Sequence, residues 1–321
     1  MSKSAMLTIA YVTYRLWPLW LFVGCATYIQ FRGKVKLKLK RQLFDHSTFT
    51  SPYNCLCYLF SAVPNTPVQE LERFSDLDPL QKNWLTIRDE ALRLYEEGHI
   101  KKSENFSDLA FNTFFKRGWK RFYLKWYGDF MPSAKELCPR TVDLVQSIPS
   151  VNAALFAVLP GHSKLGAHRD PFAGSLRYHL GLKTPNSDQC RIYIDGLPHA
   201  WRDGQAIMFD ETYIHSVNND TDDVRIILFC DVTRPLRTAA MRALNHFMIR
   251  YVVKLTETQN AAGERVGLLN HFSGYIYSLR EAYERRKKAN KTFFRLAQYA
   301  IVVGMVFLVA TLAFLKLHGK P

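Results

Sequence analysis

The chain has 321 residues, 48% of them hydrophobic, and a formal net charge of +15 at pH 7. This length is enough for a full hydrophobic core in one large or two small domains. A strong positive charge often signals nucleic-acid binding, but residues 150–235 carry eight Lys and Arg against ten Asp and Glu, so 8 − 10 = −2. The surplus lies beside long apolar runs, which favours an anionic membrane surface and argues against nucleic acid.

The N-terminal part is predicted to be a membrane anchor. Residues 7–29 are largely apolar and aromatic, and long enough to span a bilayer. A cleaved signal peptide is the competing interpretation. The basic run from Arg32 to Arg41 follows directly, which favours retention of the anchor with the next segment on the cytoplasmic side. Residues 30–76 are therefore predicted to be a basic juxtamembrane and connecting segment.

Residues 77–150 are predicted to form a helical, aromatic-rich flank. Apolar residues recur every three to four positions from Leu80 to Leu94. Residues 105–130 then contain ten Phe, Tyr and Trp. Helices packed on a β core explain this density best, and an acyl-chain groove is the alternative.

Short strands bounded by turns are predicted across residues 151–235. The expected strands are 153–159, 176–182, 191–194, 205–209 and 224–232. Strands of this length and spacing indicate a mainly β core, a jelly roll or barrel, and not βαβ units.

The C-terminal part is predicted to be helical and then to cross the membrane. Helices are expected at 241–254 and 272–288, within a basic juxtamembrane region covering 236–292, and residues 295–316 form a second apolar span. The basic flank from Arg285 to Lys288 again places the middle of the chain on the cytoplasmic side. The six cysteines show no paired framework, which indicates a reducing compartment.

Three residues form a candidate metal site. His168 and Asp170 are two apart, and His215 follows forty-five residues after Asp170. Residues two apart at the end of a strand point the same way and can hold one ion. Two imidazoles and one carboxylate on one face of a six-coordinate metal make the facial triad of non-haem Fe(II) oxygenases. His168, Asp170 and His215 are therefore the predicted metal ligands and catalytic residues.

Arg225 is a candidate anion-binding residue. It stands in the apolar run of residues 224–230, and a guanidinium in a β core is costly unless an anion satisfies it. A dicarboxylate cosubstrate would supply that anion, and an ion pair with Asp222 or Asp223 is the structural alternative. Trp201, Gly204 and Asp210 are read as structural residues.

The spacing of these motifs resembles the aspartyl/asparaginyl β-hydroxylase family. The resemblance rests on His168-x-Asp170-x44-His215, Ser175-Leu-Arg177-Tyr-His179-Leu-Gly-Leu, Trp201-x2-Gly204-x4-Phe209-Asp210 and Val224-Arg225-Ile-Ile-Leu. It implies a double-stranded β-helix, Fe(II) and 2-oxoglutarate as cofactors, O2 as cosubstrate, and contacts to 2-oxoglutarate from Arg177, His179 and Arg225. Spacing alone leaves open which arginine meets the distal carboxylate.

The similarity extends to the bacterial lipid A 2-hydroxylase branch of that family. The segments 41–53 and 168–179 carry it. It implies hydroxylation at the 2-position of an acyl chain on lipid A, in the bacterial inner membrane with the catalytic domain on the cytoplasmic side. The animal protein hydroxylases of the family lack a carboxylate ligand, whereas this chain has Asp170 at that position.

Three alternatives stay open at this stage. One is hydroxylation of another membrane lipid, such as an ornithine lipid, and a second is β-hydroxylation of an Asp or Asn in a protein. The third is a non-catalytic membrane-binding module. The sequence identifies no substrate-binding residue.

Overall fold

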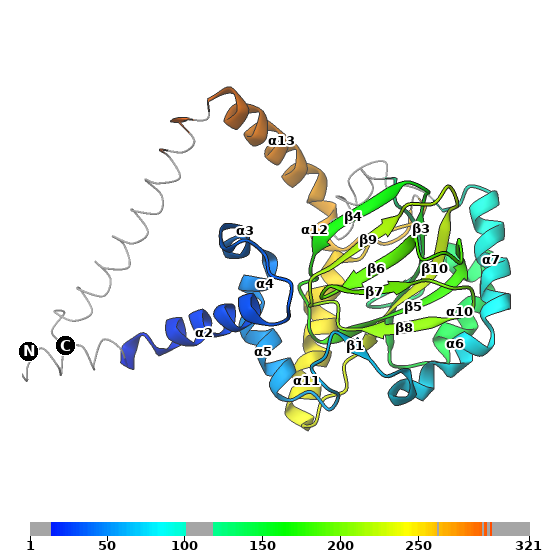
Figure 1. The fold of residues 1–321 in the computed structure, drawn as a ribbon, viewed down its shortest axis with the longest axis horizontal. Coiled ribbons are helices and arrows are strands. Elements are labelled where there is room, and N and C mark those ends of the chain that lie inside the picture. Colours follow the sequence, from blue (N-terminus) through cyan, green and yellow to red (C-terminus); the bar gives the residue numbers. More distant parts are fainter. Residues whose placement is uncertain (1–13, 101–117, 262, 291, 294–295, 297–321) are drawn as a thin grey trace, which may run out of the picture. The chain divides into compact units, whose positions relative to one another are not determined.

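The computed structural model describes residues 14–100, 118–261, 263–290, 292–293 and 296 (Figure 1). The chain divides into two compact units, one formed by Phe22–Ser273 and the other by the two chain ends. The first unit holds all the strands and every candidate site residue. In the second, the described elements are the start of α2 (Trp17–Phe31) and most of α13 (Ser273–Ala289).

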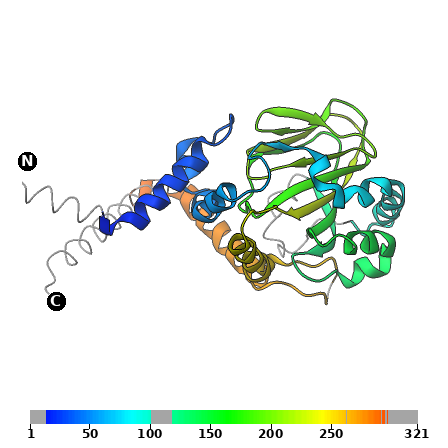
Figure 2. The same ribbon diagram turned by 90° about the horizontal axis from the view of Figure 1, so that it is seen from below.

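Two antiparallel sheets form the centre of the first unit. The larger sheet has the order β1-β8-β5-β10-β3-β2 and the smaller one β4-β9-β6-β7. Their bounds are β1 (Val68–Gln69), β2 (Lys120–Trp126), β3 (Val151–Leu159), β4 (Ser163–His168), β5 (Ser175–Lys183), β6 (Cys190–Ile194), β7 (Leu197–Ala200), β8 (Ala206–Phe209), β9 (His215–Asn219) and β10 (Arg225–Thr233). The predicted jelly-roll core, with flanking helices, is confirmed (Figures 1 and 2).

The central strands of the larger sheet are buried on both faces. Nearly every residue of β3, β5 and β10 is inaccessible to solvent. One face meets the smaller sheet, and helices on the outer side cover the other, with α7 (Trp84–Glu96) packed on β5 (Figure 1). The neighbouring outer helices are α6 (Asp78–Lys82), α9 (Pro132–Leu137) and α10 (Pro139–Gln146). Burial from both sides explains why β10 reads as a continuous apolar run.

The helical flank predicted over residues 77–150 is wrong at residues 120–126, whereas α7, α9 and α10 are helical as predicted. Residues 120–126 form the edge strand β2, which pairs with β3 so that Phe122 lies opposite Phe156 and Tyr123 opposite Leu155. Aromatic side chains suit a pleated, buried surface, and here cross-strand packing decides the local structure. Residues 105–117 lie outside the described part of the chain.

Short helices precede and follow the sheets. Before them come α3 (Leu39–Leu43), α4 (His46–Phe49), α5 (Ser51–Leu59) and η1 (Leu71–Leu77). After them come α11 (Ala239–Phe247), η2 (Met248–Val252), η3 (Val253–Thr256) and α12 (Leu268–His271), and the helices predicted at 241–254 and 272–288 are present. Within the described residues every helix is too short or too polar to pass through a bilayer. All of the predicted span 295–316 except residue 296, and residues 7–13 of the predicted span 7–29, lie outside those residues, so both spans stay predictions.

Gly181 in β5 is required by a close backbone approach. A Cβ at this position would stand 2.1 Å from the carbonyl oxygen of Arg202. We expect Gly181→Ala to lower the free energy of unfolding by about 1–3 kcal/mol, because backbone has to move. Chemical denaturation of the purified chain measures this. Gly24→Ala is the matched control, since no atom lies within 4 Å of its added Cβ, and equal stability losses for both variants would contradict the prediction.

Candidate metal centre

The three predicted metal ligands come together at one end of the smaller sheet. His168 ends β4 and His215 begins β9, and the two face each other across the ladder with ring centroids 4.2 Å apart. Asp170 follows in the loop after β4. One ligand atom from each of the three lies within 4.8 Å of the others. The strand-to-loop position predicted for the His-x-Asp pair is confirmed, and this donor set fits a facial metal site.

Both histidines are held in the tautomer that a metal requires. His168 Nδ1 lies 2.8 Å from the Gly166 carbonyl oxygen, and His215 Nδ1 lies 3.0 Å from that of Tyr213. A carbonyl oxygen only accepts, so each Nδ1 carries the proton and donates it. Each Nε2 is thereby left with its lone pair for a metal ion, in the orientation that its backbone partner sets.

The carboxylate of Asp170 is held by a buried arginine. Arg177 Nη1 donates to Asp170 Oδ2 at 2.5 Å, and the same guanidinium also pairs with Glu211 and, at 2.9 Å, with Asp231. Asp170 Oδ1 lies 3.9 Å from His168 Nε2. One oxygen of Asp170 is therefore fixed by Arg177 while the other faces the histidines.

Burial and these charges shift the pKa values of the site strongly. Burial alone would raise the pKa of Asp170, but Arg177, His215 and His168 together hold it far below its usual range. Burial, followed by the neighbouring His168, lowers the pKa of His215 to about 3. Burial raises the pKa of Glu211 despite the Arg177 contact, since three carboxylates share one positive charge. At neutral pH the three ligands are thus an ionised carboxylate and two neutral imidazoles, the forms that bind metal.

A second group of buried polar side chains lies beside this triad, between the two sheets. Arg225 is 1% exposed, and its Nε and Nη2 have no hydrogen-bond partner among the described residues. The same holds for both ring nitrogens of His179 and for Trp201 Nε1. The Arg225 guanidinium lies 4.4 Å from the Trp201 ring centroid, and the His179 and Trp201 rings are 6.1 Å apart.

Phe209 connects this group to the metal site. Its ring centroid is 5.0 Å from that of His179 and 5.8 Å from that of His215. Burial lowers the pKa of Arg225 to about 10, and no carboxylate contributes to that shift. The structural alternative of an ion pair with Asp222 or Asp223 is wrong, because Arg225 makes no ion pair with any described residue, and Asp222 pairs with His162 at 2.8 Å. A cluster of unsatisfied buried donors ending in a guanidinium fits a bound carboxylate.

Arg177 and Arg225, which the sequence spacing did not distinguish, differ in their ion-pair partners. Arg177 is engaged by three carboxylates, whereas Arg225 has no ion-pair partner in the described chain. Trp201, read as structural, instead covers the Arg225 guanidinium with its ring and directs an unsatisfied N–H into the same group. In the sequence Trp201 is marked only by its position five residues before β8, and that position alone indicates no chemistry.

Asp210, also read as structural, ties the loop before His215 to the N-terminal segment. Its carboxylate pairs with Arg32 at 2.5 Å and with Arg234 at 2.8 Å. The Arg32 guanidinium lies between the rings of Tyr58 and Tyr213, 3.9 and 3.8 Å from their centroids. Since Tyr213 supplies the carbonyl that orients His215, residues far upstream of the β core help to position a metal ligand.

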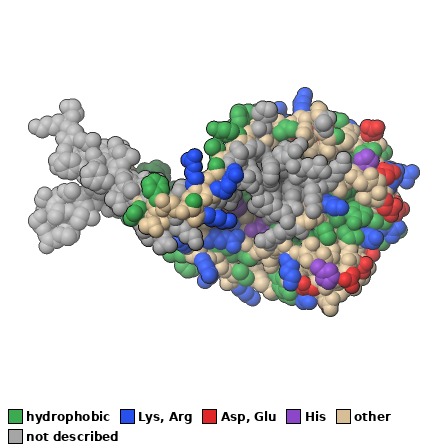
Figure 3. All heavy atoms as spheres, turned by 90° about the horizontal axis from the view of Figure 1, so that it is seen from above, with side chains coloured by type: hydrophobic (Ala, Val, Ile, Leu, Met, Phe, Trp, Pro, Cys, Tyr) green, Lys and Arg blue, Asp and Glu red, His purple; other side chains and the backbone are tan. Residues whose placement is uncertain are grey.

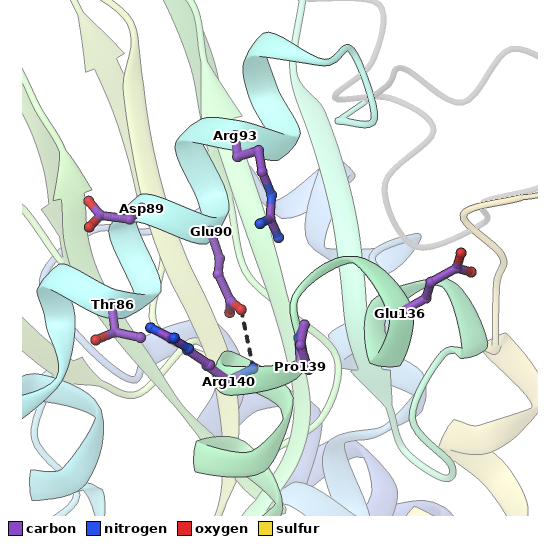
Figure 4. Close-up of a pocket in the computed structure, with 7 residues that line it drawn as sticks. All are labelled: Thr86, Asp89, Glu90, Arg93, Glu136, Pro139 and Arg140. Carbon is purple, nitrogen blue, oxygen red and sulfur yellow. Dashed lines mark hydrogen bonds between the residues drawn. The ribbon is translucent and has the colours of Figure 1, made fainter.

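A surface hollow on the outer helices is separate from this chemistry. It lies between α7 and α9–α10 (Figure 4) and is lined by Thr86, Asp89, Glu90, Arg93, Glu136, Pro139 and Arg140. Glu90 accepts from the backbone N–H of Arg140 and from Thr141, and so caps the start of α10. This hollow is a helix junction whose buried charge is satisfied.

The fold is a jelly roll of two antiparallel sheets, and it places a candidate metal site, His168, Asp170 and His215, beside a group of buried donors without partners among the described residues. Residues 81–235 match the family model described as Aspartyl/Asparaginyl beta-hydroxylase. Over this segment, a little under half of its length, the chain is similar to the aspartyl/asparaginyl β-hydroxylase family.

Similar proteins differ in how much of the chain they match. An ornithine lipid ester-linked acyl 2-hydroxylase of Rhizobium tropici is 29% identical over 71% of this chain and 80% of its own length. Human aspartate beta-hydroxylase domain-containing protein 2 is 28% identical over 58% of this chain, which spans only 52% of that protein. Human aspartyl/asparaginyl beta-hydroxylase is 26% identical over 51% of this chain and 22% of its own length. Among solved structures, a prolyl-4-hydroxylase of Pseudomonas putida aligns with 48% of this chain and 87% of its own at 17% identity and a TM-score of 0.32.

Removal of the Arg177 charge is expected to destabilise the protein strongly. Arg177→Met leaves the carboxylates of Asp170, Glu211 and Asp231 buried without their cation, which costs about 3–5 kcal/mol. Thermal or chemical denaturation measures the loss. Arg202→Met is the control, because Arg202 pairs with an Asp188 side chain that is 79% exposed, and such pairs contribute at most about 1 kcal/mol. Equal losses for the two variants would show that Arg177 does not hold the cluster together.

The stability that His179 contributes is expected to depend on pH. Burial, with the nearby Arg177 and Arg225, lowers the pKa of His179 well below its usual value. The unfolded chain then binds a proton near pH 6.5 that the folded chain excludes, so stability is complete above about pH 6.5 and falls as pH drops. We expect wild type to lose up to about 1.4 kcal/mol per pH unit relative to His179→Phe below that point. Denaturation of both proteins across this range tests it, and parallel profiles would contradict it.

Proposed function

We propose that the chain is an Fe(II)- and 2-oxoglutarate-dependent dioxygenase that hydroxylates an acyl chain of a membrane lipid at the 2-position. The observation that carries the proposal is the buried guanidinium of Arg225, whose Nε and Nη2 have no partner in the described part of the chain, beside the His168, Asp170 and His215 triad. A triad alone suits several metals and reactions. A set of buried, unsatisfied donors that includes a guanidinium, next to the triad, is the feature that points to 2-oxoglutarate.

The residues present fit both cofactors. His168, Asp170 and His215 would hold Fe(II), and Arg225, with His179 and Trp201 beside it, would receive the distal carboxylate of 2-oxoglutarate. Arg177 would act mainly by holding Asp170 in place. Arg225 is therefore the better candidate for the predicted contact with the distal carboxylate of 2-oxoglutarate. When bound, iron and 2-oxoglutarate with O2 supply the oxidising chemistry that breaks an unactivated C–H bond, releasing succinate and CO2.

The protein's own residues prepare this site before the cofactors arrive. Gly166 and Tyr213 carbonyls fix the imidazole tautomers, and Arg177 keeps the Asp170 carboxylate ionised. The rings of Phe209, Phe229 and Trp201 surround His179 with centroids 5.0, 5.3 and 6.1 Å away. Such an apolar lining excludes water from the neighbourhood of the reacting atoms, which strengthens every charge interaction there.

Lipid A is the substrate that the sequence resemblance suggests, and an ornithine lipid is the second candidate. The Rhizobium relative named as an ornithine lipid acyl 2-hydroxylase aligns over a larger share of both chains than the animal proteins do. That breadth supports a lipid acyl chain over a protein side chain. We place the enzyme in the bacterial inner membrane, with its catalytic unit on the cytoplasmic side, because basic residues flank both predicted spans.

Lipid mass spectrometry tests the function directly. Lipid A and ornithine lipids from cells that express the chain should gain one oxygen atom on an acyl chain, only when O2 is present and only with His168 intact. His168→Ala is the inactive variant, and its expression is checked in the same membranes. Unchanged lipids with a hydroxylated Asp or Asn in a peptide would move the substrate to a protein. Failure of purified protein to bind iron or turn over 2-oxoglutarate would make it a non-catalytic membrane module.

The assignment of Arg225 predicts a selective defect in cosubstrate use. Arg225→Met removes a charge-assisted contact to one carboxylate, so we expect the KM for 2-oxoglutarate to rise by on the order of 10–100-fold. Iron affinity should change little, since Arg225 does not touch the triad. Initial rates across 2-oxoglutarate concentrations, beside Arg202→Met as control, measure this. A loss of iron binding with an unchanged KM would refute the assignment.

A further inference from the structure

The segment of α3, α4 and α5 is built with its polar side chains turned inward. Its buried residues, each at most 7% exposed, include Gln42, Ser47, Thr48, Ser51 and Asn54. They form a hydrogen-bonded layer: Gln42 Nε2 donates to the hydroxyls of Ser47 and Thr48, and Ser51 donates to the Thr48 carbonyl. This layer joins the three short helices, which pack in succession along the chain (Figure 1).

The same segment turns its large apolar side chains outward. The residues concerned are Leu39 (66% exposed), Leu43 (58%), Phe44 (77%), Phe49 (67%) and Leu59 (70%). A water-facing surface normally has the opposite arrangement, with apolar residues on the inner face. Clustered apolar exposure of this kind marks a surface that meets another apolar phase or partner. We call these five side chains the apolar rim.

The charge around the apolar rim is positive. Lys34, Lys36, Lys38, Lys40 and Arg41 are all exposed, while Asp45 is the only acid between residues 30 and 60 and caps α4 through Ser47. Acidic side chains gather at the other end of the catalytic unit, where α7 lies (Figure 3), for example Asp89 (67% exposed) and Glu97 (49%). This asymmetry would orient the unit toward an anionic surface with the rim facing it.

The apolar rim is attached to the loop that carries the metal ligands. Arg41 Nη2 donates to the carbonyl of Ala167 at 2.8 Å, one residue before His168. Asn54 donates to the carbonyl of Pro171 at 3.0 Å and accepts from the N–H of Ala173, also at 3.0 Å. Asp170 lies between these anchor points. A surface that contacts the rim therefore also lies close to the loop that carries His168 and Asp170.

We propose that α3–α5 is an in-plane membrane-docking surface whose apolar rim enters the headgroup and acyl boundary of an anionic phospholipid bilayer. The surrounding lysines and Arg41 bind the lipid phosphates, and the rim supplies the apolar contact. Docking there holds the loop 167–173 against the bilayer, where a lipid acyl chain is within reach of the metal site. Only the access of a lipid acyl chain to the metal site rests on the proposed function.

A depth measurement on the full chain tests the docking surface without relying on activity. An environment-sensitive fluorophore is attached through Phe44→Cys, with the unsubstituted chain labelled in parallel as the background. The protein is reconstituted in phosphatidylcholine vesicles with and without phosphatidylglycerol, and quenching by acyl-brominated lipid is recorded. We expect blue-shifted, lipid-quenched emission at position 44, and at least about threefold less quenching when Lys36, Lys38 and Lys40 are changed to Gln.

The matched control is Leu85→Cys on α7, an apolar residue that is 49% exposed at the acidic end of the same unit. Position 85 should stay water-exposed in both kinds of vesicle. Equal accessibility of positions 44 and 85 in anionic vesicles would overturn the proposal. A second outcome would also overturn it: the protein self-associates in a concentration-dependent way, Phe44→Asp abolishes this association, and position 44 contacts no lipid. The rim would then be an interface with a second copy of the chain.

The two proposals can fail independently. If the rim is embedded in lipid but no lipid in the same membranes is hydroxylated, the docking surface is supported and the lipid substrate is refuted. If a lipid is hydroxylated but position 44 is fully exposed to water, the enzymatic function is supported and the docking surface is refuted. Iron-dependent 2-oxoglutarate turnover by the Phe44→Asp variant checks that the metal site itself is intact.

Discussion

The buried guanidinium of Arg177 is the interaction on which the site depends. It joins β5 to β10 through Asp231, to the loop before β9 through Glu211, and to the metal-binding loop through Asp170. Three buried carboxylates depend on this one cation, because its removal would leave their charge uncompensated. One residue on the larger sheet thus fixes a ligand that belongs to the smaller sheet, and the two sheets cannot shift without disturbing the triad.

Asp210 is the centre of a second set of buried ion pairs. Its pairs with Arg32 and Arg234 bring the N-terminal segment and the chain after β10 to the loop that ends at His215. Burial alone would raise the pKa of Asp210, but the two arginines lower it far below its usual value. The loop is consequently held by charge on one side and by the Arg177 cluster on the other. The unit Phe22–Ser273 therefore depends on residues outside the segment 81–235 that matches the family model.

Sequence reasoning succeeded where a single pattern determines the structure. The apolar runs at 153–159 and 224–232 became buried central strands, and the His-x-Asp spacing placed two ligands at a strand end. It failed for β4, β7 and β9, because short strands of the smaller sheet are only partly buried and carry polar residues such as Ser163, His199 and Asn218. Cross-strand pairing, which no local pattern records, also turned residues 120–126 from an expected helix into the edge strand β2.

Two features could be found only in three dimensions. The sequence left Arg177 and Arg225 equivalent, and only their partners separate a cation that orders the site from one that awaits an anion. The apolar rim likewise depends on which side of α3–α5 faces inward, and helices of four to nine residues are too short for periodicity to decide. In both cases the informative observation is a side chain in an unfavourable environment: a buried charge that has no partner among the described residues, and large apolar side chains that are exposed. A carboxylate and a lipid bilayer are the environments that would satisfy them.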